Sequence, residues 1–521
     1  MESNNKKITI LLLTNRDSDN AGDQVIEASD IGLLHALMKN LGFEKKAYKI
    51  NSRSASIVTK KYMVTRDPEL LSTAETAISQ ADIVIFGGAP VFNYGYQSFY
   101  ERTAVTLEIA QKYGKPVIFS AIGIEAYDEN SKKCQRLKSV LNIGCVKQIT
   151  TRDGLERLEK YNDNNSFKIG LVSDPAVFSS TVFENFIGNK DSSPVKEKKK
   201  IGIFVIRANG FIDNNIDFSK EQSAELWLNI IETLKSRGYD YELVTSGHFG
   251  DEAYLDYLIR EYNVPVNKCV FNINMPETLF RKMSEYDGVI SCRLHPSIIS
   301  FSMNIPAVGL VWNTKVPSFY KGIGYPERAI EKEEFCAEAI VGKLEKAMEE
   351  GIEKDQDYLM SVYQSLFFGV KDIVCGKDCD IQPYEYETLL EMIPRFAGTS
   401  ENEQYLKLTR KFRRAYETCN KRLKDNLKLK ERIVNLTENN NKKRKDAAIK
   451  ITVIQVLLSV IIMAMLIRLN VLPTVSYFLI GIILICLLVY VRSLLGLGRK
   501  NNLLVRILRK IKRIIMSILG R

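Results

Sequence analysis

Short apolar runs alternate with longer helical patterns over the first 190 residues of the chain. The runs contain almost no polar residues, which is typical of parallel strands buried on both faces. The predicted strands are Ile8–Leu13, Asp82–Phe86, Pro116–Ala121 and Val146–Thr150, and the predicted helices are Gln24–Leu41, Gln97–Tyr113 and Gly154–Tyr161. Strands that alternate with helices in this way indicate βαβ units and a parallel sheet.

A second series of the same kind occupies residues 201–400. Its predicted strands are Ile201–Ile206, Tyr241–Thr245, Val270–Ile273, Gly288–Ser291 and Ala307–Val311, and its helices are Phe218–Ser236, Asp251–Tyr262, Pro276–Ser284 and Glu331–Glu349. Residues 191–200, which are mostly Ser, Lys and Glu, read as a linker. We therefore expect an α/β fold with two doubly wound, Rossmann-like lobes, residues 1–190 and residues 201–400 with trailing helices. This is the general build of GT-B-type glycosyltransferases, with a cleft between the lobes.

Residues 401–446 change character. Apolar residues recur at spacings of three and four from Tyr405 onwards, and Gly and Pro are absent from Ser400 to Asp446. This pattern predicts a long helix. The helix either forms a coiled coil, through which the chain self-associates, or packs as an amphipathic helix against the second lobe.

Residues 447–492 contain two long apolar segments, Ile449–Ile467 and Val475–Val491, joined by a short connection. Basic residues flank both outer ends, so we predict a transmembrane hairpin with both ends in the cytoplasm; a buried helical hairpin is the alternative. Residues 493–521 alternate basic and apolar residues, as in a basic amphipathic helix on an anionic membrane surface; binding to a partner helix is the alternative. The expected location is the cell membrane, with two spans and with the lobes and both termini in the cytoplasm.

Charge and cysteines narrow the partners further. The net charge is +11, but residues 401–521 hold 26 Lys and Arg against 7 Asp and Glu, whereas residues 1–400 hold 47 against 55. This balance argues against nucleic acid as a partner of the lobes. The nine Cys are scattered, which suits reduced thiols in a cytosolic compartment. Cys375 and Cys379 lack a second Cys or His pair nearby, so we expect no metal site.

Candidate chemistry is concentrated where the predicted strand Gly288–Ser291 ends. Arg293-Leu294-His295 follows that strand and precedes a predicted helix. An Arg and a His at the carboxyl end of a strand, beside a helix N-terminus, form an anion-binding arrangement. The sequence from Arg293 through Lys315 to Gly324 closely resembles the signature of the polysaccharide pyruvyl transferase family. Further resemblances occur in family order along the chain: Asn20-Ala21-Gly22-Asp23, Asp82 to Gly88, Thr151-Arg152-Asp153, Asp174-Pro175 and Ile201 to Arg207. The loop Gly87-Gly88-Ala89 departs from the family, many members of which carry a third glycine.

The resemblance implies transfer of pyruvate from phosphoenolpyruvate onto two hydroxyls of a sugar, as a ketal, without a further cofactor. By resemblance, Arg207, Arg293 and the Leu294 backbone hold phosphoenolpyruvate. His295 contacts the phosphate and acts as an acid, either protonating the enol carbon or assisting phosphate departure. The other candidates for substrate binding are Lys315, His248, Asn20, Gly22, Gly87 and Gly88, and Asp23 is the candidate base for an acceptor hydroxyl.

Structural alternatives accompany these assignments. His295 could make only a helix-start hydrogen bond, Arg207 an interlobe ion pair and Lys315 a surface salt bridge. Asp23 could serve as the N-cap of the following helix.

The leading functional hypothesis is a membrane-anchored pyruvyl transferase of cell-envelope polysaccharide synthesis. Its partners would be phosphoenolpyruvate and a saccharide acceptor, either a cell-surface polysaccharide or its lipid-linked precursor. A GT-B glycosyltransferase using a nucleotide sugar is the first alternative, although no acidic pair is placed for a nucleotide ribose. A non-catalytic scaffold of a polysaccharide-assembly complex is the second.

Overall fold

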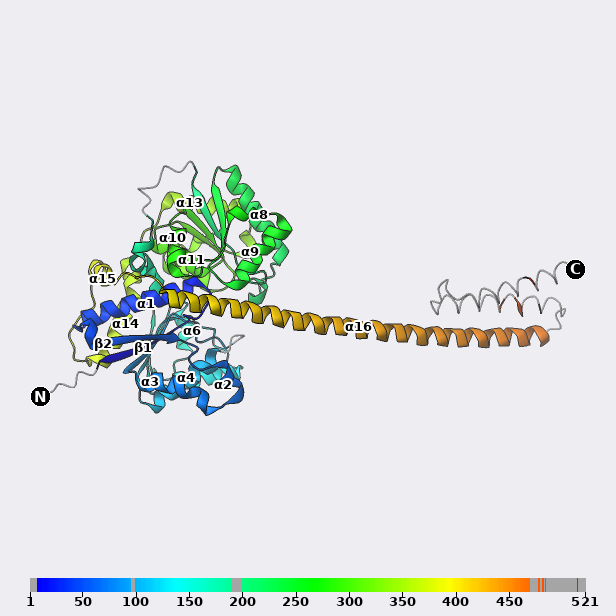
Figure 1. Cartoon of the computed structure of the whole chain (residues 1–521), viewed down its shortest axis with the longest axis horizontal. Helices are drawn as coiled ribbons and strands as arrows, with labels where there is room; N and C mark the ends of the chain where they lie inside the picture. Colours follow the sequence, from blue (N-terminus) through cyan, green and yellow to red (C-terminus); the bar gives the residue numbers. More distant parts are fainter. Residues whose placement is uncertain are drawn as a thin grey trace. The chain divides into compact units, whose positions relative to one another are not determined.

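The computed structural model describes residues 7–94, 99–188 and 198–468, together with residues 477, 480, 481, 483 and 513. The chain divides into two units, Met1–Arg413 and Arg414–Arg521. The first unit contains two α/β lobes (Figure 1).

The first lobe is built on a parallel sheet of six strands in the order β2-β1-β3-β4-β5-β6. The strands are β1 (Ile8–Thr14), β2 (Tyr48–Ser54), β3 (Ile83–Gly87), β4 (Val117–Ile122), β5 (Val146–Thr151) and β6 (Lys168–Leu171). Its helices are α1 (Ala21–Asn40), α2 (Lys60–Thr65), α3 (Ser72–Ser79), α4 (Phe99–Lys112), α5 (Lys132–Leu141), α6 (Leu155–Glu159) and α7 (Ser179–Val182). Every residue of β3 and β4 is buried, because helices cover both faces of the sheet centre.

The second lobe repeats this design. Its parallel sheet also has six strands, in the order β12-β11-β10-β7-β8-β9. The strands are β7 (Lys200–Phe204), β8 (Asp240–Val244), β9 (Cys269–Val270), β10 (Gly288–Ser291), β11 (Ala307–Leu310) and β12 (Ala329–Ile330). Its helices are α8 (Lys220–Ser236), α9 (Phe249–Tyr262), α10 (Pro276–Met283), α11 (Leu294–Ser302), α12 (Lys315–Gly322) and α13 (Ala337–Glu350). The predicted fold of two doubly wound lobes is therefore confirmed.

The chain returns to the first lobe after α13. Helix α14 (Gln356–Val374) packs near β4 and β5, where Gln148 donates a hydrogen bond of 2.9 Å to the Ser365 carbonyl. Ser173 likewise donates to the Leu359 carbonyl at 2.9 Å. Helix α15 (Tyr386–Met392) follows. One apolar core joins α1 with α10, α11 and α14, so the two lobes pack against each other through α1.

Each sheet has one point at which the chain reverses its direction of travel across the sheet. In the first lobe this point lies between β1 and β3, and in the second lobe it lies between β7 and β10. Ligands of open α/β sheets bind beyond the carboxyl ends of the strands at such points. The loops after β1, β3, β7 and β10 are therefore the first places to look for a site.

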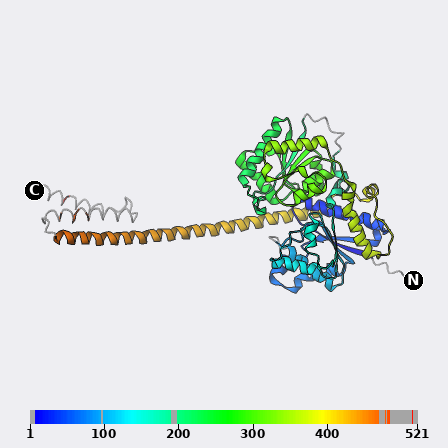
Figure 2. The ribbon, with the colours of Figure 1, turned by 180° about the vertical axis from the view of Figure 1, so that it is seen from behind.

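The predicted long helix is confirmed as α16 (Glu401–Arg468). Its first turns contact both lobes, and Figures 1 and 2 show them lying alongside each lobe. Lys407 donates to Gln24 of α1 at 2.8 Å, and Lys411 pairs with Glu252 of α9 at 2.6 Å. Arg410 pairs with Asp17 of the first lobe at 2.5 Å.

The described part of the chain contains no helix with the length and apolar composition needed to cross a bilayer. The predicted span at Ile449–Ile467, which lies within α16, is therefore not supported. The predicted second span, Val475–Val491, lies outside the described residues except for residues 477, 480, 481 and 483. The predicted amphipathic helix at 493–521, except residue 513, and the linker at 191–200, except its last three residues, also lie outside them.

Candidate functional site

The loops at the carboxyl ends of the two sheets meet between the lobes. The amide of Ala21, at the start of α1, donates a hydrogen bond of 2.7 Å to the carbonyl of Ser246, which follows β8. Gly247 packs so tightly that an added Cβ would lie 2.8 Å from the Asp19 carbonyl oxygen, and its φ of +90° is in the left-handed region that favours glycine. We call the charged cluster at this junction the interlobe site, formed by Asn20, Asp23, Arg152, Arg293, His295 and Lys315.

His295, in the first turn of α11, lies against the start of α1. An added Cβ on Gly22 would overlap the His295 side chain, so glycine permits this approach. The Asn20 side chain caps α1 by accepting a hydrogen bond of 3.1 Å from the Gly22 amide, and its amide nitrogen lies 3.3 Å from Nδ1 of His295. Since that Asn20 nitrogen can only donate, Nδ1 accepts and the neutral imidazole carries its proton on Nε2.

The surroundings of His295 keep it neutral. Burial lowers its pKa well below the ordinary value, and the positive charges of Arg152, Lys315 and Arg293 lower it further. The Nε2 atom is buried and has no hydrogen-bond partner among the described residues. A buried donor without a partner is costly, so this N–H is suited to a ligand.

Lys315 reaches the first lobe from the start of α12. A Cβ atom added to Gly123 of the first lobe would lie 3.1 Å from the ammonium nitrogen of Lys315 and 3.2 Å from a carboxylate oxygen of Asp153. Among the described residues, no carboxylate oxygen lies within 4.0 Å of the Lys315 ammonium nitrogen. The surface salt bridge considered for Lys315 is therefore not formed with any of these residues. Lys315 is therefore available to an anion in the interlobe site.

Asp23 faces the same cluster from the first turn of α1. Burial raises the pKa of its carboxyl group, while hydrogen bonds from Ser18 and Asn15 and the charges of Arg152 and Lys315 act in the opposite direction. Asn20, not Asp23, provides the N-cap of α1. The alternative that Asp23 caps α1 is therefore wrong. Asp23 is instead a partly buried acid close to the cations Arg152 and Lys315.

Arg152 was not among the predicted site residues, although Thr151-Arg152-Asp153 matched a family position. It follows β5, pairs with the buried Asp174, and donates a hydrogen bond of 3.2 Å to the Gly88 carbonyl. Its positive charge lowers the pKa of both His295 and Asp23. An arginine directly after a buried strand was the signal that should have placed it in the site.

Asp251 is a second residue that sequence reasoning missed. Its carboxylate receives two bonds from the Arg293 guanidinium, Nε at 2.8 Å and Nη2 at 2.5 Å, and one of 2.8 Å from the Arg207 amide. Burial alone would raise its pKa, but Arg293 and His248 outweigh burial and lower the pKa to about 2. Asp251 is therefore ionised and orients Arg293. The sequence feature that could have identified it is an acidic residue three positions after His248, at the start of α9.

The remaining candidates of the second lobe lie around this group. Arg207 forms an ion pair of 2.9 Å with Asp213, which belongs to the same lobe rather than to the opposite one. His248 caps α9 by accepting a hydrogen bond of 3.1 Å from the Gly250 amide. Leu294 begins α11, so its amide lies at a helix N-terminus that favours anions.

Gly87 and Gly88 are packed against α1. Added Cβ atoms would overlap Asp30 at Gly87 and Ile26 at Gly88, and the φ of Gly88 is +52°. The Gly88 amide donates to the Ser120 carbonyl at 3.0 Å, so it is already occupied. Their place in substrate binding stays a prediction.

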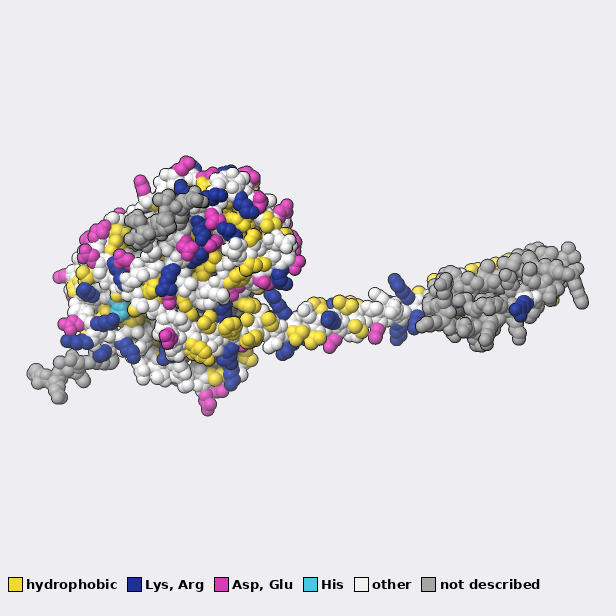
Figure 3. All heavy atoms as spheres, turned by 45° about the horizontal axis from the view of Figure 1, so that its top comes forward, with side chains coloured by type: hydrophobic (Ala, Val, Ile, Leu, Met, Phe, Trp, Pro, Cys, Tyr) yellow, Lys and Arg dark blue, Asp and Glu magenta, His cyan; other side chains and the backbone are white. Residues whose placement is uncertain are grey.

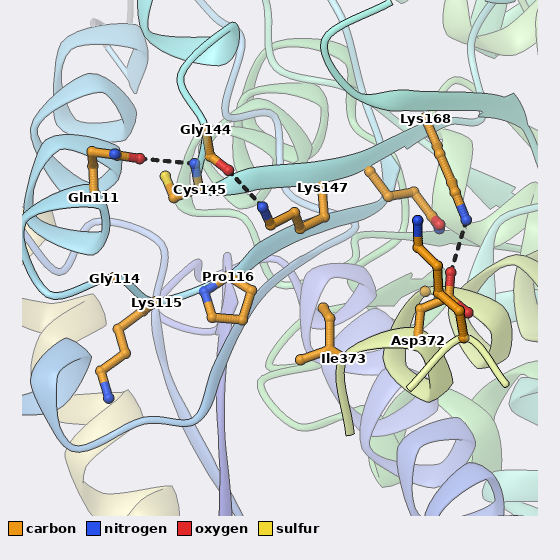
Figure 4. A pocket seen from close by; sticks show the side chains of 13 residues that line it. Gln111, Gly114, Lys115, Pro116, Gly144, Cys145, Lys147, Lys168, Asp372 and Ile373 are labelled. Atoms are coloured by element: carbon orange, nitrogen blue, oxygen red, sulfur yellow. Dashed lines mark hydrogen bonds and ion pairs between the residues drawn. The ribbon is translucent and has the colours of Figure 1, made fainter. Parts of the chain in front are cut away.

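A cavity of about 730 Å³ lies elsewhere on the first lobe (Figure 4). Some of its lining residues, among them Pro116, Cys145 and Lys168, precede or begin β4, β5 and β6, and others belong to α14, so the cavity opens at the amino ends of these strands. Figure 4 shows Lys168 paired with Asp372, at 2.8 Å. This cavity is separate from the interlobe site.

Within the described ranges, no group of three or more His, Cys, Asp or Glu side chains could hold a metal ion.

Comparison with known proteins identifies a family for this chain. The model of the family described as polysaccharide pyruvyl transferase matches residues 19–314, which begin beside Asn20 and end beside Lys315. A search of curated proteins gives no match.

Some solved structures of low sequence identity also align with this chain. A UDP-GlcNAc 2-epimerase from Methanocaldococcus jannaschii is 14% identical with a TM-score of 0.42, and the alignment covers 69% of this chain and 98% of that one. The MnaA–UDP co-structure from S. aureus is 12% identical with a TM-score of 0.45 and coverage of 73% and 100%. A glycosyl transferase family 9 structure from Veillonella parvula is 12% identical with a TM-score of 0.30 and coverage of 71% and 97%.

Proposed function

The chain belongs to the polysaccharide pyruvyl transferase family, and from this membership we propose that it transfers pyruvate from phosphoenolpyruvate onto two hydroxyls of a saccharide. The observation that carries the proposal is the buried, unpartnered Nε2 of His295, surrounded by the charges of Arg152, Lys315 and Arg293. A neutral proton donor among several cations suits a small, highly charged anion with an acid-sensitive double bond.

The donor would bind on the second-lobe side of the interlobe site. Phosphoenolpyruvate carries a carboxylate and a phosphate, so it needs fixed cations and backbone donors. Lys315 provides an ammonium group with no ion pair among the described residues, and the first turn of α11 provides amides. Arg293 is held in one orientation by Asp251, which leaves its Nη1 for a ligand.

Binding of phosphoenolpyruvate would change the protonation of His295. The negative charges of the donor offset the nearby cations, so the pKa of His295 rises and the imidazole gains a second proton at Nδ1. This step requires the Asn20 side chain to turn its carbonyl oxygen toward the ring, because its amide nitrogen cannot accept a hydrogen bond. His295 can then donate from Nε2 to the methylene carbon of the donor or to the departing phosphate. The two acceptor hydroxyls form the two new C–O bonds of the ketal, and the C–O bond to phosphate breaks with its electron pair leaving on the phosphate. Asp23 would accept one hydroxyl proton. Of the two hydroxyl protons released overall, one ends on the methylene carbon, which becomes a methyl group, and the other ends on the phosphate, so donor plus diol give ketal plus phosphate without any redox change.

The first prediction concerns His295. In His295→Asn, phosphate release from phosphoenolpyruvate in the presence of a saccharide acceptor should fall by about 10²- to 10⁴-fold, the usual contribution of a general acid. Phosphoenolpyruvate affinity should change much less. The matched control is His35→Asn, because His35 lies in α1 outside the interlobe site and bonds to Tyr48. Consumption of a nucleotide sugar by the wild type, equally fast in His295→Asn, would instead favour the glycosyltransferase hypothesis.

We further propose that the acceptor belongs to a cell-surface polysaccharide or its lipid-linked precursor and that the chain works at the cytoplasmic surface of the membrane. The support is the sequence of residues 493–521, in which apolar residues alternate with basic ones. A chain lacking residues 447–521 should move from the membrane fraction to the soluble fraction. A truncated chain that stays with the membrane would contradict this part of the proposal.

A further inference from the structure

Helix α16 carries a row of large apolar side chains that no other described part of the chain covers. Every residue from Cys419 to Ala447 is exposed. Among them, the exposed fractions are 55% for Leu429, 61% for Ile433 and 55% for Leu436. Figure 3 shows apolar side chains at the surface along the described part of this helix. Exposed apolar area of this extent on one helix is typical of an interaction surface.

Leu429, Ile433 and Leu436 fit a seven-residue repeat. Between Ala415 and Asn440, the first position of the repeat (a) is occupied by Cys419, Asn426, Ile433 and Asn440, and the fourth position (d) by Ala415, Arg422, Leu429 and Leu436. A repeat of seven places both positions on one face of a helix, which supercoils with a second helix to keep that face buried.

We propose that residues 415–440 form a parallel, in-register coiled coil with a second copy of this chain. Ile433 at position a, between Leu429 and Leu436 at position d, favours two strands. Arg422, the one charged residue at these eight positions, can extend its apolar stem along the seam and place its guanidinium in solvent. In a parallel and in-register pair, each Asn at position a meets the same Asn of the second copy, and the two amides can bond to each other. A different partner helix would have to supply matching polar residues at both places.

The charges that flank the seam agree with this arrangement. Asp425 lies one residue before position a, and Lys430 one residue after position d, five residues further along. In a parallel pair these two positions face each other across the seam, so Asp425 of each copy meets Lys430 of the other. The inference is independent of the proposed function, since no residue of the interlobe site takes part.

A competing contact face exists on the same helix. Leu423, Leu427 and Val434 are 58%, 51% and 54% exposed and lie on a different side of the helix from the seven-residue repeat. The competing face would place position 427, rather than position 419, at the centre of a dimer. Cysteine cross-linking distinguishes these two arrangements.

The experiment uses the full-length chain in mild detergent and oxidises it gently. Cys419 is an exposed free thiol, and in the proposed dimer it faces Cys419 of the second copy at a spacing that a disulfide can bridge. We expect the 59.3 kDa chain to shift to twice that mass on a non-reducing gel, and Cys419→Ser to lose the shift. Leu427→Cys in the Cys419→Ser background should not restore it. No shift in the wild type, or restoration by Leu427→Cys, would overturn the proposal.

A second measurement does not depend on thiol chemistry. Ile433→Glu combined with Leu436→Glu should reduce the mass in light scattering from two chains to one, while Asn435→Glu, off the seam, should leave two. Circular dichroism must show that the variants keep their helix content. A wild-type chain of single mass, or a double variant that remains dimeric, would contradict the coiled coil.

Discussion

Asp30 is a buried acid that the proposed chemistry does not use. It lies in α1, and neither of its carboxylate oxygens has a hydrogen-bond partner among the described residues. Burial raises its pKa well above 3.8, and the nearby charge of Asp174 raises it further. Gly87 makes room for this carboxyl group, since an added Cβ there would overlap it. Asp30 is therefore held in its neutral form, with its carboxyl group against Gly87 at the end of β3.

Asp30 should make stability depend on pH. Because its pKa is raised in the folded state, the folded chain binds more protons than the unfolded chain between the two pKa values, so stability falls as pH rises through that window. Asp30→Asn cannot titrate and should lose this fall. Above the window the variant should be more stable than the wild type by on the order of 1 kcal/mol or more in denaturant unfolding. The exposed Asp380→Asn serves as the control, and identical pH profiles for wild type and Asp30→Asn would contradict the account.

At the level of elements, the start of α1 and the start of α11 form one assembly. Asn20 caps α1 and contacts His295, and Gly22 leaves the space that His295 occupies. The two helices come from different lobes. The position of the His295 ring therefore depends on how the two helix starts fit together.

Gly22→Ala tests this fit. The added methyl group would overlap His295 and must displace it, and a displacement near 1 Å at a reacting group costs about 100-fold in rate. We expect the turnover of phosphoenolpyruvate to fall by about that factor. Gly342→Ala in α13 is the matched control, because an added Cβ there meets nothing within 4 Å. Unchanged turnover in Gly22→Ala would mean that the His295 position is not set by α1.

Buried strands could be predicted from the sequence more accurately than exposed ones. Central strands such as β3 and β10 were predicted within about a residue, because helices on both faces require uninterrupted apolar residues. The edge strands β2, β6 and β12 were missed. The polar residues of β2 and the half-exposed residues of β6 resemble loop sequence, and β12 has only two residues.

At the level of the whole molecule, the sequence placed the candidate residues at strand ends but not their partners. Arg293 was predicted to hold the donor, but its partner Asp251, 42 residues earlier in the chain, was not predicted. The environments of Asp30 and Arg152 likewise depend on segments that meet only when the sheet forms. Such contacts leave no local pattern of hydrophobic and polar residues, so the charges of the site needed the three-dimensional structure.

The central claim is that the interlobe site binds phosphoenolpyruvate with Lys315 and His295, and calorimetric titration of the full-length chain tests it most directly. The wild type should bind saturably and take up protons, which titrations in two buffers of different ionisation enthalpy would reveal, because donor binding raises the pKa of His295. Lys315→Ala should bind about 10- to 100-fold more weakly, the loss expected for one charge-assisted bond. Lys321→Ala, on the exposed side of the same helix, should bind like the wild type. Absence of binding, or equal affinity in Lys315→Ala, would contradict the claim.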